Sequence, residues 1–220
     1  MLTTRNKEVA FHADMESIPH ELRFLSEEEC WTLFCKKALP KNASPVVSPE
    51  LQKVGRDIVG KCGGLPLAIV VLGGLLSRKD RIPSDWAKVL KRINEKFCEG
   101  HDQITSILAL SYDDLPYYLK SCFLCLGFFP EDQEIPARKL IQLWLAEGLV
   151  QQRGSETMEE VAENYLKELI DRSMVQVARK SSVGIKTCRI HDMLWNLSIS
   201  EAMEDKFLDV RQITDFESPV

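Results

Sequence analysis

The stretch Gly63-Gly64-Leu65-Pro66-Leu67-Ala68 joins two helical patterns of different kinds. Residues 48–62 before it place apolar side chains at the spacing of an amphipathic helix. Residues 65–76, which begin within the stretch, form an apolar run without charges. The glycine pair can end the first helix, and Pro66 can open the second because a first-turn residue needs no N–H donor. We therefore expect a helical corner whose second helix is buried in the core.

Further helices flank this corner and predict a first helical bundle over residues 26–102. Ser26 and Glu29 have the spacing of a capping box, and Ser48, which precedes a proline, is typical of a helix start. Another amphipathic pattern covers residues 86–97. These elements together can enclose a core around the apolar helix.

Residues 103–205 continue with helices and end in a hairpin pattern. The helical patterns cover residues 104–110, 119–128 and 140–145, followed by a long helix that a capping box at Thr157 and Glu160 begins. The period then changes to two, because residues 174–178 and 185–190 alternate around a glycine-containing loop. Helix, turn, helix, helix and hairpin in this order predict a winged helix.

The N-terminal part of the chain carries two strand-like segments without partners, and a last strand-like run over residues 207–210 leads into a tail. Residues 1–5 read as the tail of a strand and residues 20–25 as another short strand, and two short strands cannot form a stable sheet alone. We therefore expect the partners of these strands to be missing from this sequence. The predicted fold is mainly α: a helical bundle, then a winged-helix domain, with a small α/β remnant at the N-terminus.

The composition, with 45% hydrophobic and 28% charged residues, is that of a globular protein. A net charge of −5 and a pI near 5.5 provide no electrostatic footprint for nucleic acid or an anionic membrane. Seven cysteines without a regular framework favour a reducing, cytoplasmic location. The apolar run over residues 65–76 is shorter than the ~20 residues that a transmembrane span needs.

A phosphate-loop pattern at Gly55, Gly60 and Lys61 is expected to be fortuitous. Such a loop lies between a strand and a helix, so that backbone N–H groups face the phosphates. These residues instead lie within an amphipathic helical pattern. Cys62 also stands where a hydroxyl would bind magnesium.

Metal binding and DNA binding are two further alternatives. Cys122 with Cys125, and Cys188 with His191, have spacings found among zinc ligands, but the first pair lies in an apolar run typical of a core. Residues 138–149 could be the recognition helix of a winged-helix DNA-binding regulatory module. That segment carries only two basic residues and many apolar ones, so burial is the simpler interpretation. The tryptophans expected to anchor the core are Trp31, Trp86, Trp144 and Trp195.

Two helix starts are candidates for a nucleotide site. Pro66 presents a flat apolar ring that could pack on a purine, although a plain helical corner explains the same residues. His191 opens another helix, where free N–H groups and the positive end of the dipole favour an anion. A phosphate beside it would favour the imidazolium form, whereas a helix-starting histidine followed by Asp192 is the simpler alternative.

Six motifs in order resemble those of plant NB-ARC disease-resistance proteins, and the coiled-coil class is the most similar. The motifs are Leu2-Thr3-Thr4-Arg5, residues 25–34, Gly64-Leu65-Pro66-Leu67, residues 122–132, residues 140–148 and Ile190-His191-Asp192. The resemblance implies that residues 1–25 end a nucleotide-binding domain, 26–102 form the helical ARC1 domain, 103–205 form the winged-helix ARC2 domain, and 206–220 lead toward leucine-rich repeats.

The resemblance also implies a switch in an intracellular plant defence receptor, which holds ADP in the inactive state and ATP in the active state. The implied nucleotide-binding residues are Thr4, Arg5 near the terminal phosphate, Pro66 and Leu67 against adenine, and His191 on the ADP phosphate. Ile190 stands where the family usually has Met or Val, an apolar change that leaves the role of His191 intact. Magnesium is expected to bind only through the missing part of the nucleotide-binding domain.

The sequence contains no Walker A loop, magnesium-binding aspartate on a strand, coiled coil or leucine-rich repeats. We therefore expect a fragment or truncated gene product that is not an enzyme, because phosphoryl transfer needs that loop and its metal. The full-length parent is expected to be a slow STAND-type ATPase that oligomerises on activation. The expected partners are the nucleotide-binding and leucine-rich-repeat domains of the same receptor, with membrane association only after activation and no bound nucleic acid.

Overall fold

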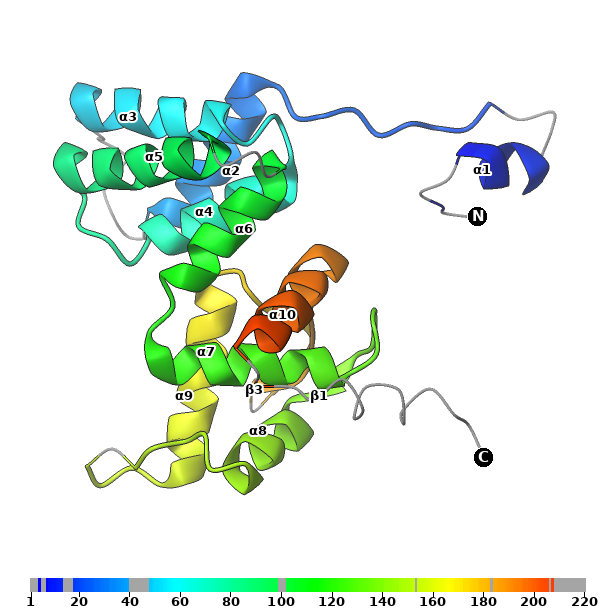
Figure 1. The fold of residues 1–220 in the computed structure, drawn as a ribbon, viewed down its shortest axis with the longest axis vertical. Coiled ribbons are helices and arrows are strands. Elements are labelled where there is room, and N and C mark those ends of the chain that lie inside the picture. Colours follow the sequence, from blue (N-terminus) through cyan, green and yellow to red (C-terminus); the bar gives the residue numbers. More distant parts are fainter. Residues whose placement is uncertain are drawn as a thin grey trace.

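A computed structural model describes Thr4, Phe207 and residues 7–13, 18–39, 48–98, 102–152, 154–182 and 184–205. The helices form two lobes stacked one above the other (Figure 1). The upper lobe comprises residues 27–98, the lower lobe comprises residues 117–204, and helix α6 (Gln103–Asp113) connects them. A short helix α1 (Lys7–Ala13), which the sequence pattern did not predict, lies away from both lobes in Figure 1.

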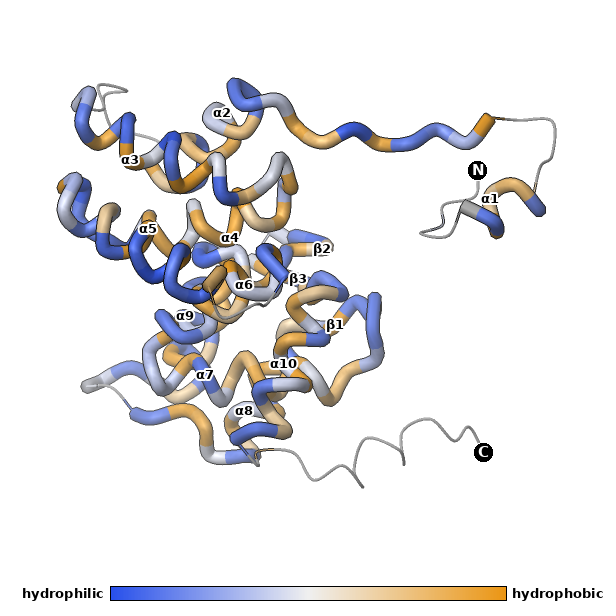
Figure 2. The backbone as a smooth tube through the Cα atoms, turned by 45° about the horizontal axis from the view of Figure 1, so that its top comes forward, coloured by the Kyte–Doolittle hydropathy of each residue, from blue (hydrophilic) through white to orange (hydrophobic). Residues whose placement is uncertain are grey.

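The upper lobe follows the predicted order of helices. Ser26 and Glu29 form the capping box at the start of α2, and the Ser48 hydroxyl accepts a hydrogen bond from the Leu51 amide at the start of α3. Outer helices α3 and α5 alternate between hydrophilic and hydrophobic segments along their length, as amphipathic helices do (Figure 2). The helices are α2 (Glu27–Ala38), α3 (Pro49–Gly60), α4 (Pro66–Leu76) and α5 (Pro83–Cys98).

Helix α4 is apolar all round and contributes to both lobes. Ile69 and Leu72 are fully buried in the upper-lobe core, whereas Val71 is fully buried in the lower-lobe core. Helix α6 is divided in the same way, since Ile107 packs in the upper core and Leu108 in the lower one. A helix that is hydrophobic on every face must be covered on every face. The two lobes therefore share a continuous apolar contact.

The lower lobe is a winged helix, as predicted. Its three-stranded antiparallel sheet has the order β1-β3-β2, with Ile135 opposite Cys188. The capping box at Thr157 and Glu160 begins its long helix, as expected. The elements are α7 (Tyr117–Leu124), the 3-10 helix η1 (Cys125–Phe128), β1 (Ile135–Pro136), α8 (Ala137–Ala146), α9 (Met158–Asp171), β2 (Gln176–Ser181), β3 (Gly184–Arg189) and α10 (Asp192–Glu204).

Two sequence-based expectations about local structure were wrong. Residues 20–25 do not form a strand, because no strand pairs with them among the described residues. The Leu25 amide instead donates a hydrogen bond to the Gly64 carbonyl. Trp86 and Trp144 are fully buried, but Trp31 and Trp195 are only half-buried and lie at the edges of their cores. In the described part of the chain, no helix combines the length and the apolar character that crossing a membrane requires.

Candidate functional site

The start of α4 lies beside the segment that arrives from the N-terminal part of the chain. The Leu25 amide donates a hydrogen bond to the Gly64 carbonyl at 3.0 Å. Two residues later Pro66 occupies the first turn of α4, where its ring is exposed, as the sequence predicted for a helix start. Leu67 is half-buried and packs against the lower-lobe core. Pro66 thus offers an apolar surface two residues from the turn that binds Leu25, and Leu67 packs against the core of the lower lobe.

Gly64 is required for this arrangement. Its φ is +79°, and a Cβ built on it would lie 2.9 Å from both the Leu25 carbonyl oxygen and the Phe24 Cβ. A side chain at residue 64 would therefore strain the turn and push away the arriving segment. Sequence reasoning assigned the glycine pair only to ending a helix and missed the contact with Leu25. The doubled glycine was the available signal, since one glycine is enough to end a helix.

His191 is the N-cap of α10, as expected. Its side chain is 37% exposed, its Nδ1 lies 3.3 Å from the Met193 amide, and the Asp192 carboxylate lies against the same nitrogen. The Met193 amide also donates to Asp192 at 2.8 Å. With Nδ1 engaged by its own chain, Nε2 is the ring nitrogen available to a ligand. The helix start adds the positive end of the helix dipole.

The remaining predicted site residues lie in the N-terminal segment. Arg5 is outside the described residues, so its expected place near a terminal phosphate is not tested. Thr4 is described, is exposed and belongs to no helix or strand. The structure therefore describes the three candidates on α4 and at the start of α10, namely Pro66, Leu67 and His191.

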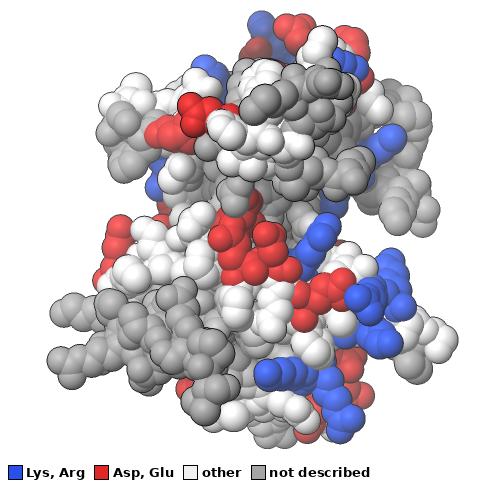
Figure 3. Space-filling view, turned by 90° about the vertical axis from the view of Figure 1, so that its right-hand side faces the viewer, with Lys and Arg blue, Asp and Glu red and all other residues white. Residues whose placement is uncertain are grey.

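A cavity with a volume of about 510 Å³ runs between the lobes from the first turn of α10. Met193 marks that end, and Glu201 and Glu204 lie toward the other end of α10. Burial, together with the charges of Glu204, Asp113 and Asp205, raises the pKa of Glu201 above its ordinary value, while Lys96 acts in the opposite direction. Figure 3 shows acidic side chains near the boundary between the lobes. The acidic residues therefore lie at the end of the cavity opposite the positive end of the α10 dipole.

The competing patterns have structural explanations. Gly55 and Gly60 lie within the continuous helix α3, so the phosphate-loop pattern is part of a helix. Cys122 and Cys125 are buried, and burial raises the pKa of Cys125 to about 12, which keeps the thiol protonated. Among the described residues, no group of three histidine, cysteine or acidic side chains is placed to hold a metal ion.

Helix α8, considered above as a recognition helix, contributes mainly to the lower-lobe core. Leu140, Ile141 and Trp144 are buried, and the Trp144 indole N–H donates to the Cys122 carbonyl at 3.1 Å. Arg138 is exposed at the start of the helix, next to one further basic residue. This surface has little of the positive charge that normally dominates DNA affinity.

Comparison with protein families gives two matches. Residues 128–198 match the family described as "Disease resistance protein Winged helix domain". Residues 1–44 match the family described as "NB-ARC domain". The first match covers most of the lower lobe, and the second covers the segment that leads into α2 and continues beyond its end.

Curated relatives agree with these matches. The chain is 42% identical to "Disease resistance protein RPP13" of Arabidopsis thaliana over 96% of its own length, and 37% identical over 96% to "Disease resistance protein RPM1" of the same plant. It is 39% identical to "ToMV resistance protein Tm-2(2)" of Solanum lycopersicum over 94% of its length. The chain spans only about a quarter of each relative, namely 25%, 23% and 24%.

Proposed function

Because this chain contains the winged-helix domain of plant disease resistance proteins and part of an NB-ARC domain, we propose that it is a nucleotide-dependent switch segment of an intracellular immune receptor. In this proposal the two lobes close over ADP in the inactive receptor and separate when ATP replaces it. A phosphate-binding loop and its magnesium would be supplied from outside these 220 residues. The chain by itself would carry out no phosphoryl transfer.

The observation that carries the proposal is the hydrogen bond between the Leu25 amide and the Gly64 carbonyl. The bond joins the turn before Pro66 to the chain that arrives from the NB-ARC match, and we propose that a nucleotide bound by that domain would be within reach of the exposed ring. Pro66 and Leu67 would contact the adenine, and Thr4 and Arg5 would lie on the phosphate side. An exposed apolar ring at a helix start suits a purine face, because it offers contact area without competing polar groups.

His191 would distinguish ADP from ATP. A ligand shifts a conformational equilibrium only by binding the two states unequally, so some contact must depend on the number of phosphates. At the start of α10 the imidazole Nε2 and the positive end of the helix dipole would favour one anionic group at a fixed place. The Asp192 carboxylate, which lies against Nδ1, would orient the ring.

The test is replacement of His191 in the complete receptor. His191→Ala should speed ADP release by about 10- to 100-fold, because a charge-assisted hydrogen bond is worth about 1.5–3 kcal/mol, and should raise resting activity. His191→Asn should behave in the same way, since asparagine is a good N-cap that lacks the imidazole. Nucleotide content and release are measured by chromatography and by a fluorescent ADP analogue.

The control for this test is His20→Ala, at an exposed histidine away from α10. It should leave ADP release and resting activity unchanged. Normal ADP release in both His191 variants would refute the role of the imidazole. Normal release in the asparagine variant alone would assign the effect to the helix cap instead.

The proposed partners are inferred from the length of the relatives, because this chain spans only 23% and 25% of two of them. They would be the remaining nucleotide-binding domain and the leucine-rich repeats of the same receptor, with oligomerisation after the lobes separate. The receptor would act in the cytoplasm, with membrane association only after activation.

A further inference from the structure

Helix α4 and the end of α9 meet backbone to backbone. A Cβ built on Gly74 would lie 2.5 Å from the Arg172 carbonyl carbon and 2.8 Å from its Cα. Only a residue without a side chain allows this approach. Val71, one turn earlier on α4, is fully buried in the lower-lobe core. The upper and lower lobes are therefore in direct contact along this flank.

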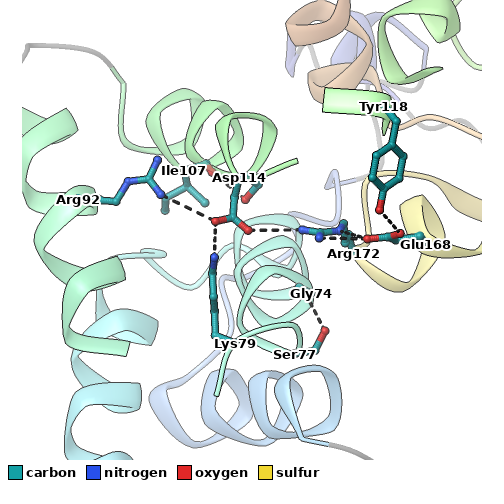
Figure 4. Close-up of polar contacts among 10 residues, drawn as sticks. Gly74, Ser77, Lys79, Arg92, Ile107, Asp114, Tyr118, Glu168 and Arg172 are labelled. Atoms are coloured by element: carbon teal, nitrogen blue, oxygen red, sulfur yellow. Dashed lines mark hydrogen bonds and ion pairs between the residues drawn. The ribbon is translucent and has the colours of Figure 1, made fainter. Parts of the chain in front are cut away.

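A cluster of charged side chains surrounds this contact, and Asp114, just after α6, lies at its centre (Figure 4). Lys79 Nζ lies 2.6 Å from Asp114 Oδ1, and Arg92 Nη1 lies 3.9 Å from the same atom. Both cations belong to the upper lobe. From the lower lobe, Arg172 Nη1 lies 3.4 Å from Asp114 Oδ2. One carboxylate is thus shared by cations of both lobes.

The lower-lobe side of the cluster is held in place by further hydrogen bonds. Arg172 donates from Nε and Nη2 to Glu168 Oε1, at 3.1 Å each, and the Tyr118 hydroxyl lies 3.2 Å from Glu168 Oε2. The side chains of Asp114 and Arg172 are each only 9% exposed. At such burial, removal of one partner leaves the opposite charge without compensation. Without the charge of Asp114, Arg172 would keep only Glu168 as a counter-charge, and Lys79 and Arg92 would lose the carboxylate that they share with it.

We propose that Lys79, Arg92, Asp114, Glu168 and Arg172 form an electrostatic latch that holds the two lobes closed, with Asp114 as the shared counter-charge. A role of the latch in regulating the receptor rests on the function proposed above. Its effect on the contact between the lobes does not. Gly74 is eight residues along α4 from Pro66, about 12 Å at the helical rise. The latch therefore acts at the opposite end of α4 from the candidate nucleotide contact and can be altered without touching it.

A polar latch suits an interface that must open. When buried apolar surfaces separate, they become exposed to water at a cost in free energy that nothing recovers. When Asp114 and Arg172 separate, water hydrates both charges and offsets much of the lost attraction. The charged part of the interface thus stabilises the closed arrangement. Its separation costs less free energy than separation of the apolar part around Val71.

Hydrogen exchange of the full 220-residue chain tests the latch. Asp114→Asn should accelerate amide exchange about tenfold, equivalent to about 1.4 kcal/mol, in peptides covering residues 70–76 and 169–175. Exchange in α3 and in the β2–β3 hairpin, which are distant from the latch, should change by less than about twofold. Unchanged exchange at residues 70–76 and 169–175, or equal acceleration throughout both lobes, would overturn the proposal.

Two further variants keep the test decisive. Arg78→Gln is the matched control, since Arg78 pairs with Asp171 across the same flank at 3.0 Å but the two side chains are 38% and 66% exposed; it should change exchange by less than about twofold.

If Asp114→Asn does not fold, Lys79→Met takes its place. It should produce the same local pattern, at about threefold, because Arg92 and Arg172 still neutralise Asp114. No local acceleration in Lys79→Met would then count against the latch, while the proposed nucleotide contacts would remain untested by that result.

Discussion

Along the flank where α4 meets α9 the two lobes approach backbone to backbone, whereas along the flank where α5 and α6 face α10 they leave a cavity of about 510 Å³. The first flank combines buried Val71 with charges that all have partners. Each flank has one buried hydroxyl without a hydrogen-bond partner among the described residues, Ser173 beside Arg172 and Ser106 on α6, but on the second flank neighbouring carboxylates also raise the pKa of Glu201.

The difference between the flanks shows where the closed arrangement is stabilised. Close packing and satisfied charges stabilise the α4–α9 flank. The cavity and the like charges around Glu201 give the α6–α10 flank less to contribute. Closure of the lobes therefore depends on the flank that carries the latch. Substitutions there should alter the relation between the lobes, whereas substitutions on the cavity side should not.

The largest effect is expected at Gly74. Gly→Ala inside a helix is ordinarily stabilising by about 1 kcal/mol, but at Gly74 the new Cβ would overlap the backbone of Arg172, which cannot rotate away. We expect Gly74→Ala to lower the free energy of unfolding by about 3 kcal/mol, measured by urea denaturation, and to speed exchange on both sides of the flank. Gly60→Ala is the control: a Cβ at Gly60 meets nothing within 4 Å, so stability should not fall.

If Gly74→Ala proved as stable as the wild type, the backbone contact between α4 and α9 would not exist in solution. The latch would then lack the close approach on which it depends. A loss of stability without faster exchange at residues 169–175 would place the strain inside the upper lobe instead.

Local signals made much of this fold predictable from sequence. The capping boxes at Ser26 and Thr157 depend on residues three apart, and the structure shows both. The predicted hairpin segments overlap the observed strands, with the ends shifted to Gln176–Ser181 and Gly184–Arg189. The positions of Pro66 and His191 at helix starts were predicted for the same reason, since such positions are defined by neighbours in the chain.

Contacts between distant residues were not predictable in this way. Asp114 and Arg172 are 58 positions apart, and nothing in either local sequence indicates the other. The strand expected at residues 20–25 was wrong because alternation of side chains says nothing about whether a second strand is available for pairing. The contact between Leu25 and Gly64 was missed because it depends on the backbone path of two separate segments.

A smaller effect is expected from Thr157, which caps α9 at the end remote from Arg172. Thr157→Ala removes the hydroxyl that accepts from the Glu160 amide and should cost about 1 kcal/mol in unfolding free energy, measured by urea denaturation. Ser26→Ala should cost a similar amount in the upper lobe, because it breaks an equivalent capping box. Neither should speed exchange selectively at residues 70–76. Selective acceleration there would mean that helix fraying, and not the latch, controls the contact between the lobes.

The smallest effect is expected at Glu201 on the cavity side. Its pKa is raised, mainly by burial and then by Glu204 and other acidic neighbours, so the folded state favours the protonated form. A carboxyl group of this kind supports folding at low pH, and that support is lost as the pH rises through its raised pKa. Glu201→Gln should therefore match the wild type near pH 4 and exceed its stability near pH 7, by about 0.5 kcal/mol. Denaturation at both pH values measures the difference, and Glu95→Gln on the exposed face of α5 should show no such gain. A loss of stability at pH 7 in Glu201→Gln would mean that the ionised carboxylate is stabilised by the fold, and the cavity side would then contribute to closure as well.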